Sequence, residues 1–166
     1  MFNLAESIRM EPSANRSDIR SLGIPATAAQ VFAAMADPAR IARWWGPDGF
    51  RNTIHEFDFR PGGAWRLTMH GPDGKDYANE SRFTRIVPDA LFEIEHLTGH
   101  HFFLTIELRP VDRGTQVHWQ QTFDTVEHYQ GIAEFVAAAN AQNLQRLAAE
   151  VLRPGEASLQ TSGKPT

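Results

Sequence analysis

Seven histidines are the side chains of this sequence best suited to metal binding or proton transfer. Three of them, His96, His100 and His101, flank a predicted hairpin turn. On a strand–turn–strand this spacing does not bring the rings together as positions i and i+4 of a helix would, and neither H-E-x-x-H nor a facial triad is present. The sequence has no cysteine, which excludes thiolate ligands and cysteine nucleophiles. We therefore expect no bound metal and no other cofactor.

General acid–base catalysis would need a titratable group inside a cavity. The available groups are His55, His70, Glu80 and Tyr77, of which only Tyr77 falls on a strand face that we expect to point inward. The sequence contains no motif for a nucleophilic serine, a phosphate loop or a dinucleotide site. It thus assembles no catalytic site and we assign no catalytic residue, although it leaves an enzymatic activity open.

Polar side chains occur on one predicted inward strand face. In the strand over 76–86, alternation places Tyr77, Asn79 and Ser81 on the same face as Phe83. Three polar contacts are more than a plain core tolerates, which favours a ligand on this face. The alternative is that the outer half of the strand is solvated.

The last predicted strand and the C-terminal helix each carry an amide among apolar residues. Gln121 shares a strand face with Trp119, and Asn140 follows Val136 on the apolar stripe of the helix. A buried amide is costly unless it is paired. Each amide is therefore either hydrogen-bonded within the protein or available to a ligand in a cavity that the helix covers.

Two adjacent tryptophans end a short predicted helix. Successive helical residues point about 100° apart, so Trp44 and Trp45 cannot both face the same core. One interpretation buries one ring and leaves the other half exposed. The other places one ring at a cavity mouth beside Phe50, where it would stack on a planar ligand.

Hydrophobic periodicity and turn residues predict the elements that position these side chains. Strands are expected over 18–24, 51–59, 64–70, 76–86, 91–97, 102–109 and 115–123, and helices over 28–36, 38–45 and 125–152. The C-terminal helix carries an apolar stripe made of Tyr129, Ala133, Val136, Asn140, Leu144, Leu147 and Val151. This order predicts an α+β helix-grip fold, in which a seven-stranded curved antiparallel sheet surrounds a long C-terminal helix.

Length and composition indicate one globular domain. The chain has 166 residues, 42% of them hydrophobic, and we place the domain at 16–152 between flexible segments 1–15 and 153–166. Sixteen basic against twenty acidic residues argue against a nucleic-acid partner. No apolar run is long enough for a membrane span, and charged residues interrupt the first seventeen positions, which excludes a signal peptide there. A cytoplasmic location is expected.

Several local motifs resemble a known superfamily. They include Trp-Trp-Gly-Pro and Arg-Pro-Gly-Gly, and they lie in 24–32, 37–47, 59–65, 69–74, 86–91 and 114–117. Together they resemble the START-like superfamily (SRPBCC, Bet v 1-like), and within it the bacterial branch homologous to the activator of the heat-shock-protein-90 ATPase. The resemblance covers about residues 16–152.

The resemblance implies a deep cavity between the concave face of the sheet and the C-terminal helix, suited to a hydrophobic or amphipathic small molecule. We therefore expect a protein that binds a hydrophobic or aromatic ligand and is non-catalytic or of unknown activity. The alternatives are a polyketide cyclase/dehydratase-like enzyme and a chaperone-ATPase-activator-like protein-interaction module. The sequence does not determine the oligomeric state, and a homodimer is one of the options. The predicted ligand-binding residues are Trp44, Trp45, Phe50, Tyr77, Asn79, Ser81, Phe83, Trp119, Gln121, Val136 and Asn140.

Overall fold

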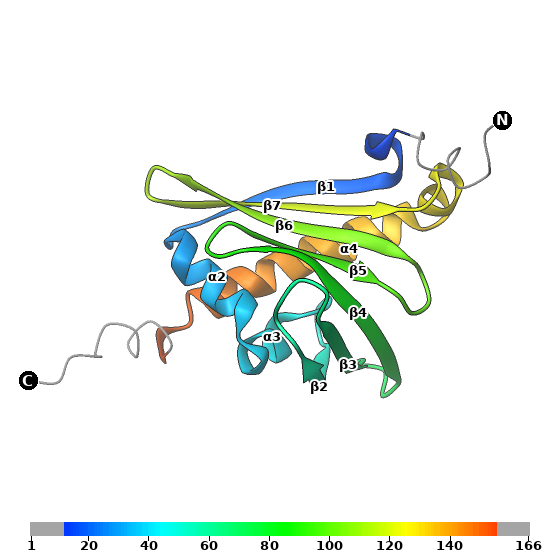
Figure 1. The fold of residues 1–166 in the computed structure, drawn as a ribbon, viewed down its shortest axis with the longest axis horizontal. Coiled ribbons are helices and arrows are strands. Elements are labelled where there is room, and N and C mark those ends of the chain that lie inside the picture. Colours follow the sequence, from blue (N-terminus) through cyan, green and yellow to red (C-terminus); the bar gives the residue numbers. More distant parts are fainter. Residues whose placement is uncertain (1–11, 156–166) are drawn as a thin grey trace, which may run out of the picture.

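The computed structural model describes residues 12–155 and confirms the α+β helix-grip fold (Figure 1). Its strands are β1 (Ser17–Ile24), β2 (Arg51–Phe57), β3 (Ala64–His70), β4 (Asp76–Val87), β5 (Leu91–His96), β6 (Phe102–Val111) and β7 (Gly114–Phe123). Its helices are the 3-10 helix η1 (Ser13–Arg16) and the α-helices α2 (Ala28–Ala36), α3 (Pro38–Trp44) and α4 (Val126–Val151). Most of the predicted flexible segments 1–15 and 153–166 lies outside the described residues. Among the described residues, no helix is long and apolar enough to cross a membrane.

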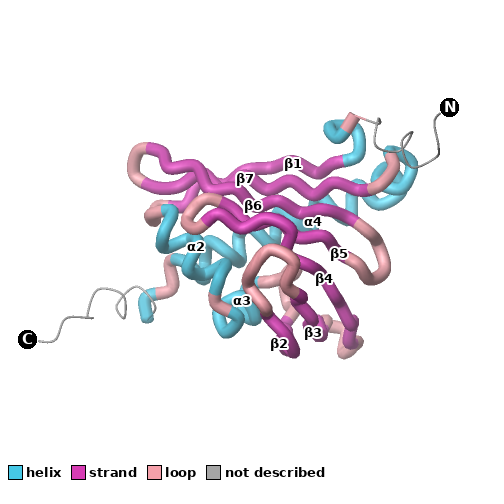
Figure 2. Tube along the Cα trace, in the orientation of Figure 1, coloured by secondary structure: helices cyan, strands magenta, loops and turns pink. Residues whose placement is uncertain are grey.

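The seven strands form one antiparallel sheet in the order β1-β7-β6-β5-β4-β3-β2. Strands β2 to β7 each pair with their neighbours in the sequence, and β1 pairs with the last strand. Figure 2 shows that α4 runs along one face of this sheet, with α2 and α3 near its C-terminal end. The inward faces of the strands and the sheet-facing stripe of α4 therefore enclose the interior of the molecule.

The two short helices begin at the residues that the sequence predicts. The Thr27 hydroxyl accepts a hydrogen bond from the Gln30 backbone N–H at 3.1 Å, and the Gln30 side chain accepts one from the Thr27 N–H at 2.8 Å. This reciprocal pair is a capping box. The Asp37 carboxylate accepts from the Ala39 N–H at 2.9 Å, and Pro38 occupies the first helical position.

Two strand ends differ from the predicted ones by two residues, and four others differ by one. The strand predicted over 51–59 ends at Phe57, because the chain turns at Asp58 and returns through Gly63. A Cβ atom at Gly63 would collide with the Asp58 carbonyl oxygen, which explains the glycine in this turn. Strand β6 continues past the predicted end at 109 and includes Pro110, which lies next to the hairpin where the ladder ends.

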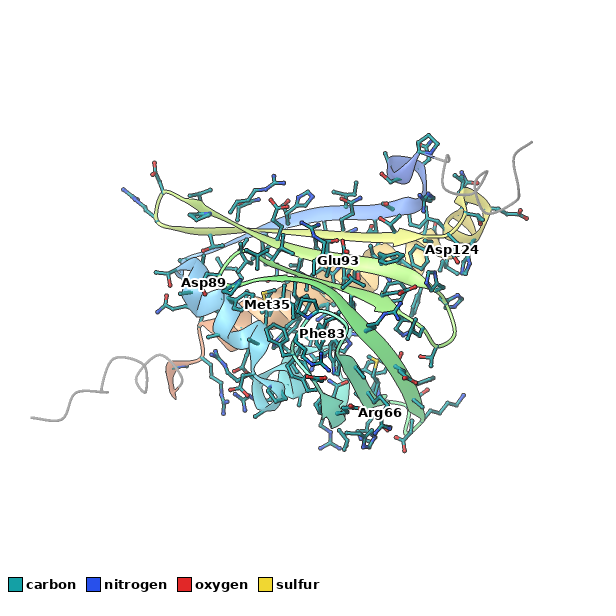
Figure 3. The ribbon with its side chains drawn as sticks, in the orientation of Figure 1. Met35, Arg66, Phe83, Asp89, Glu93 and Asp124 are labelled. Carbon is teal, nitrogen blue, oxygen red and sulfur yellow. The ribbon has the colours of Figure 1, made fainter. Side chains whose placement is uncertain are left out.

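The apolar stripe of α4 supplies much of the core. Val136, Leu144, Leu147 and Val151 are buried, whereas Tyr129 and Ala133, near the start of the helix, are half-buried. Phe83 on β4 and Met35 on α2 are fully buried between the sheet and the helices (Figure 3). The predicted packing of this helix on the sheet is therefore present along most of its length.

A polar side of α4 holds the segment that joins α3 to β2. The Arg146 guanidinium donates five hydrogen bonds of 2.7–3.0 Å to backbone carbonyl oxygens, those of Arg43, Trp45, Gly46, Pro47 and Phe50. Asn143 donates to the Trp44 carbonyl at 2.8 Å and accepts from the Gly46 N–H at 3.1 Å. These contacts satisfy backbone groups that no strand or helix pairs.

One turn further along α4, Glu150 is buried and paired with two arginines of α3. Its carboxylate accepts hydrogen bonds from Arg40 at 3.0 Å and from Arg43 at 2.8 Å. Burial would raise the pKa of Glu150, but the hydrogen bonds and charges of Arg43 and Arg40 outweigh it and hold the pKa below its usual range. We call Asn143, Arg146 and Glu150 the α4 clamp.

Leu147→Ala should lower the free energy of unfolding by about 2–5 kcal/mol, because the side chain is 0% exposed and its truncation leaves a cavity. Urea unfolding measures this loss. The control is Phe135→Ala on the same helix, where the ring is 73% exposed and the change should stay within about 0.5 kcal/mol. Equal effects of the two variants would contradict the packing of α4.

Glu150→Gln should make the stability of the protein less sensitive to acid. Because the folded-state pKa of Glu150 is depressed, its contribution is fully present above about pH 5 and is lost as the pH falls through the ordinary glutamate value toward the lower folded one. Urea unfolding between pH 3.5 and about pH 7 should show a shallower acid loss than in the wild type. The exposed Glu134→Gln on the same helix is the control, and an identical acid loss in all three proteins would refute the pairing.

Candidate functional site

A cavity of about 210 Å³ lies between the sheet and α4. One part of its wall is aromatic and apolar and consists of Trp45, Trp65, Leu67, Met69, Phe102, Leu104 and Trp119. The other part is polar and consists of Asn79, Ser81, His96, His100, Gln121, Asn140 and Asn143. Gly46, Pro47 and Ala139 complete it. Such a wall suits a small molecule with an apolar body and one polar end.

Six of the eleven predicted ligand-binding residues line this cavity. They are Trp45, Asn79, Ser81, Trp119, Gln121 and Asn140. Strand alternation accounts for four of them, because Asn79, Ser81, Trp119 and Gln121 do lie on inward faces. The helical stripe accounts for Asn140.

The structure does not bring the other five predicted residues to the cavity. Trp44 points into the core, where its indole N–H donates to the Ala34 carbonyl at 2.8 Å. Phe83 is fully buried and stacks on Trp65 with ring centroids 5.8 Å apart, so the core takes it up. Val136 is likewise buried without lining the cavity.

Phe50 and Tyr77 pair with each other outside the cavity, with ring centroids 6.1 Å apart. Tyr77 is 43% exposed, because the start of β4 extends beyond the buried part of the sheet, and its hydroxyl donates to Asp73. The alternative that the outer half of this strand is solvated is therefore correct for Tyr77. It is not correct for Ser81, which is 3% exposed.

Both interpretations of the tryptophan pair are partly realised, because the two rings point to different sides. Trp44 is buried, while Trp45 is half-buried and lines the cavity. The Trp45 ring meets Trp65 edge to face at 4.7 Å and lies 6.2 Å from Trp119. The indole N–H groups of Trp65 and Trp119 are buried and have no hydrogen-bond partner among the described residues.

Gln121 and Asn140 are both hydrogen-bonded within the protein and part of the cavity wall. The Asn140 amide donates to Gln121 Oε1 at 2.8 Å and to Asp18 Oδ2 at 3.0 Å, and Arg20 donates twice to the same Asp18 carboxylate. Burial would raise the pKa of Asp18, but the hydrogen bonds from Arg20 and Asn140 and the charge of Arg20 together lower it. This network links β1, β7 and α4.

His96, at the end of β5, lines the cavity and is not among the ligand-binding residues predicted from the sequence. Its ring stacks on Phe102 with centroids 4.4 Å apart, and it lies directly across the ladder from Ser81. Strand alternation could have found it, because His96 shares a face with Phe92 and Ile94. The sequence places it in the strand predicted over 91–97 but singles it out only as a metal candidate beside the hairpin turn.

The ring nitrogens of His96 contact two oxygen atoms. Nδ1 lies 2.7 Å from the His100 carbonyl oxygen and Nε2 lies 2.6 Å from Asn79 Oδ1. Burial lowers the pKa of His96, the charges of His100 and His101 act in the same direction, and the hydrogen bond to the His100 carbonyl opposes them. A histidine with a lowered pKa is neutral at pH 7 and can accept a proton.

The other candidate acid–base groups lie away from the cavity. His55 contacts Thr68, and His70 contacts Thr53 and Asp76, all at 2.7 Å; neither histidine lines the cavity, and neither does Glu80. The described residues contain no group of three or more His, Cys, Asp or Glu side chains that could hold a metal ion.

Asn140→Leu should destabilise the protein by about 1–3 kcal/mol, because it leaves Gln121 Oε1 without its donor and leaves the buried Asp18 carboxylate with Arg20 as its remaining side-chain donor. Had the amide been unpaired, leucine would have stabilised the protein. Thermal or urea unfolding decides between the two, with Gln145→Leu on the exposed side of α4 as the control. A more stable Asn140→Leu variant would refute the network.

Comparisons with known proteins give one family and one fold. The family model of the Activator of Hsp90 ATPase homolog 1-like protein matches residues 25–151. A comparison with curated proteins gives no match.

Three solved structures illustrate the shared fold. The solution structure of a protein from Arthrobacter aurescens has a TM-score of 0.78 and 23% identity, and the match covers 94% of this chain and 96% of that one. The crystal structure of a protein from Nitrosomonas europaea has a TM-score of 0.76 and 16% identity, with 86% and 97% covered. The solution structure of an AHSA1-like protein from Aeromonas hydrophila has a TM-score of 0.65 and 19% identity, with 90% and 99% covered.

At these identities the solved structures show the fold alone, whereas the family model matches most of the chain. The match also confirms the resemblance carried by the Trp-Trp-Gly-Pro and Arg-Pro-Gly-Gly motifs. The chain belongs to the Activator of Hsp90 ATPase homolog 1-like family, within the START-like superfamily.

Proposed function

We propose that the protein binds a hydrophobic or aromatic small molecule in the cavity between the sheet and α4 and does not transform it. The observation that carries this proposal is the cavity itself, about 210 Å³ in volume and walled by Trp45, Trp65 and Trp119. Protein interiors are close-packed and contain few voids larger than a water molecule. A half-open hollow of this size between the sheet and α4 is therefore better explained by a ligand than by packing alone.

The volume limits the ligand. Sites for drug-sized molecules enclose about 300–1,000 Å³, and this cavity is smaller. A one- or two-ring aromatic compound or a medium-length alkyl chain is the appropriate size class. The aromatic wall favours either, because tryptophan faces stack on rings and bury alkyl chains equally well.

His96 favours a second candidate, a polyketide cyclase/dehydratase-like enzyme. A neutral imidazole in the cavity wall is able to act as a general base, which none of the groups considered from the sequence can do. The protein-interaction module that the family description suggests has no comparable support. The large exposed apolar side chains of the described residues are spread over several elements, among them Ile19, Val87, Phe103 and Phe135.

Ala139→Phe should abolish ligand binding, because Ala139 faces the cavity from α4 and a benzyl group would fill it. Titration with naphthalene and 1-octanol, followed by tryptophan fluorescence, should saturate for the wild type and not for this variant. Ala138→Phe is the matched control, since Ala138 is exposed on the same helix and its variant should bind as the wild type does.

Mass spectrometry of the titrated samples separates the two candidates. Recovery of each ligand unchanged supports binding, whereas a new product that requires His96 supports the enzyme. Failure of every ligand to saturate the wild type, together with no co-purified molecule in native mass spectra, would sink the binding proposal.

A further inference from the structure

We propose that the ligand is an amphipathic carboxylic acid, whose carboxylate binds at a polar corner formed by Asn79, Ser81 and His96, and that His96 takes up one proton when it binds. This inference rests on the proposed function and specifies the ligand of the same cavity. The carboxylate accepts a hydrogen bond from the Ser81 hydroxyl and replaces Asn79 Oδ1 as the acceptor at His96 Nε2.

The strand register builds this corner. Ser81 on β4 lies directly opposite His96 on β5, and His96 lies opposite Phe102 on β6. Side chains opposite each other in an antiparallel ladder have Cβ atoms about 4.5–5.5 Å apart. Asn79 precedes Ser81 by two residues and lies on the same strand face, and its Oδ1 is 2.6 Å from His96 Nε2. The three polar groups therefore form one continuous patch on the floor of the cavity.

The unused hydrogen-bonding groups of the wall are mainly donors. The Ser81 hydroxyl and the Gln121 Nε2 amide form no hydrogen bond with the described part of the chain, whereas the unpaired indole N–H groups of Trp65 and Trp119 are buried out of reach of the cavity. The wall includes no Asp, Glu, Lys or Arg. A ligand that complements these donors presents oxygen acceptors, and an anionic acceptor meets no buried carboxylate in the wall.

His96 is the group that can supply the opposite charge. Asn79 donates its Nδ2 to the Tyr77 carbonyl oxygen at 3.1 Å, which directs its Oδ1 toward His96 Nε2. With the His100 carbonyl at Nδ1, both ring nitrogens face acceptors, and only the doubly protonated ring donates at both. In the empty cavity burial favours the neutral ring, so a bound carboxylate provides the charge that makes the imidazolium stable.

None of the titratable groups around His96 in the described structure supplies a negative charge at its ring, so a ligand carboxylate can do so. From the hairpin between β5 and β6, His100 and His101 lie close enough to lower its pKa. His101 is itself held by Glu95 and Asp124 at 2.8 and 2.7 Å, and His100 contacts His128 of α4 at 2.7 Å. The neighbours on β4 and β6, Asn79, Ser81 and Phe102, are uncharged.

From the polar corner, the apolar body of the ligand extends along the tryptophan side of the cavity. Trp65 on β3 lies directly across from Ser81 in the ladder, so a chain that leaves the corner meets its ring first. Trp45 then covers Trp65 at 4.7 Å, and Trp119 lies beyond it. The polar head and apolar tail of one short acid thus match the two parts of the wall.

Calorimetric titration with octanoate and with 1-octanol at pH 6, 7 and 8 tests this assignment. Octanoate affinity should fall by up to about tenfold per pH unit as the pH rises, because binding consumes a proton, and octanol affinity should not change. In two buffers of different ionisation enthalpy, octanoate binding should show uptake of up to about one proton per ligand at pH 7 to 8. This readout needs only the wild-type protein.

Variants identify the group. His96→Gln should bind octanol as the wild type does, bind octanoate at least about tenfold more weakly at pH 6, and show no proton uptake. Ser81→Ala should weaken octanoate binding and retain the proton uptake. The control is His118→Gln, because His118 lies on the outer face of the sheet and should affect neither ligand.

Two results would overturn the inference. The first leaves the proposed binding function in place, and the second rejects that function too. Equal, pH-independent binding of octanoate and octanol would reject the carboxylate and the role of His96 while leaving a hydrophobic binding site in place. Saturation by neither ligand nor by naphthalene would reject the inference and the proposed function together.

Discussion

The position of Trp45 depends on the α4 clamp, and the cavity depends on Trp45. The segment that joins α3 to β2 exposes a run of backbone carbonyls that no strand or helix pairs, and Arg146 gathers five of them. The two terminal nitrogens of the guanidinium carry four N–H donors in a fixed plane and between them reach all five carbonyls, which suits this task better than an ammonium group. Asn143 holds the start of the same segment at Trp44 and Gly46, and Glu150 holds α3 itself through Arg40 and Arg43. Asn52 on β2 also donates to the Trp45 carbonyl oxygen at 2.9 Å, so the segment that carries the ring is held both from α4 and from the sheet.

The polar wall of the cavity has two parts that differ in how completely they are paired. Asn140, Gln121, Asp18 and Arg20 form a network whose main donors and acceptors meet within the protein. At the corner of Asn79, Ser81 and His96 the hydroxyl is unused and the imidazole faces two acceptors. A closed network stabilises the fold, whereas unused donors in a buried place are groups that a ligand can satisfy. We propose that the first part stabilises the fold and that the second binds the polar group of a ligand.

Family membership supplies the scaffold and not the chemistry. The same helix-grip architecture is found in structures that are 16–23% identical to this chain. A fold that supports many functions cannot name one, so the argument for a ligand has to come from the wall of the cavity. In this chain that wall carries three tryptophans and a half-buried histidine with a lowered pKa.

Local periodicity in the sequence determined the order of the elements, their caps and the inward direction of Ser81, Gln121 and Asn140. Such features depend on residues a few positions apart, so they can be inferred without the fold. Only the tertiary structure decided that Trp45 rather than Trp44 lines the cavity and that Arg146 holds its loop. It also decided that His96 lies opposite Ser81. Each of these contacts joins residues from different elements, and strand register and helix docking place them together without a local sequence signal.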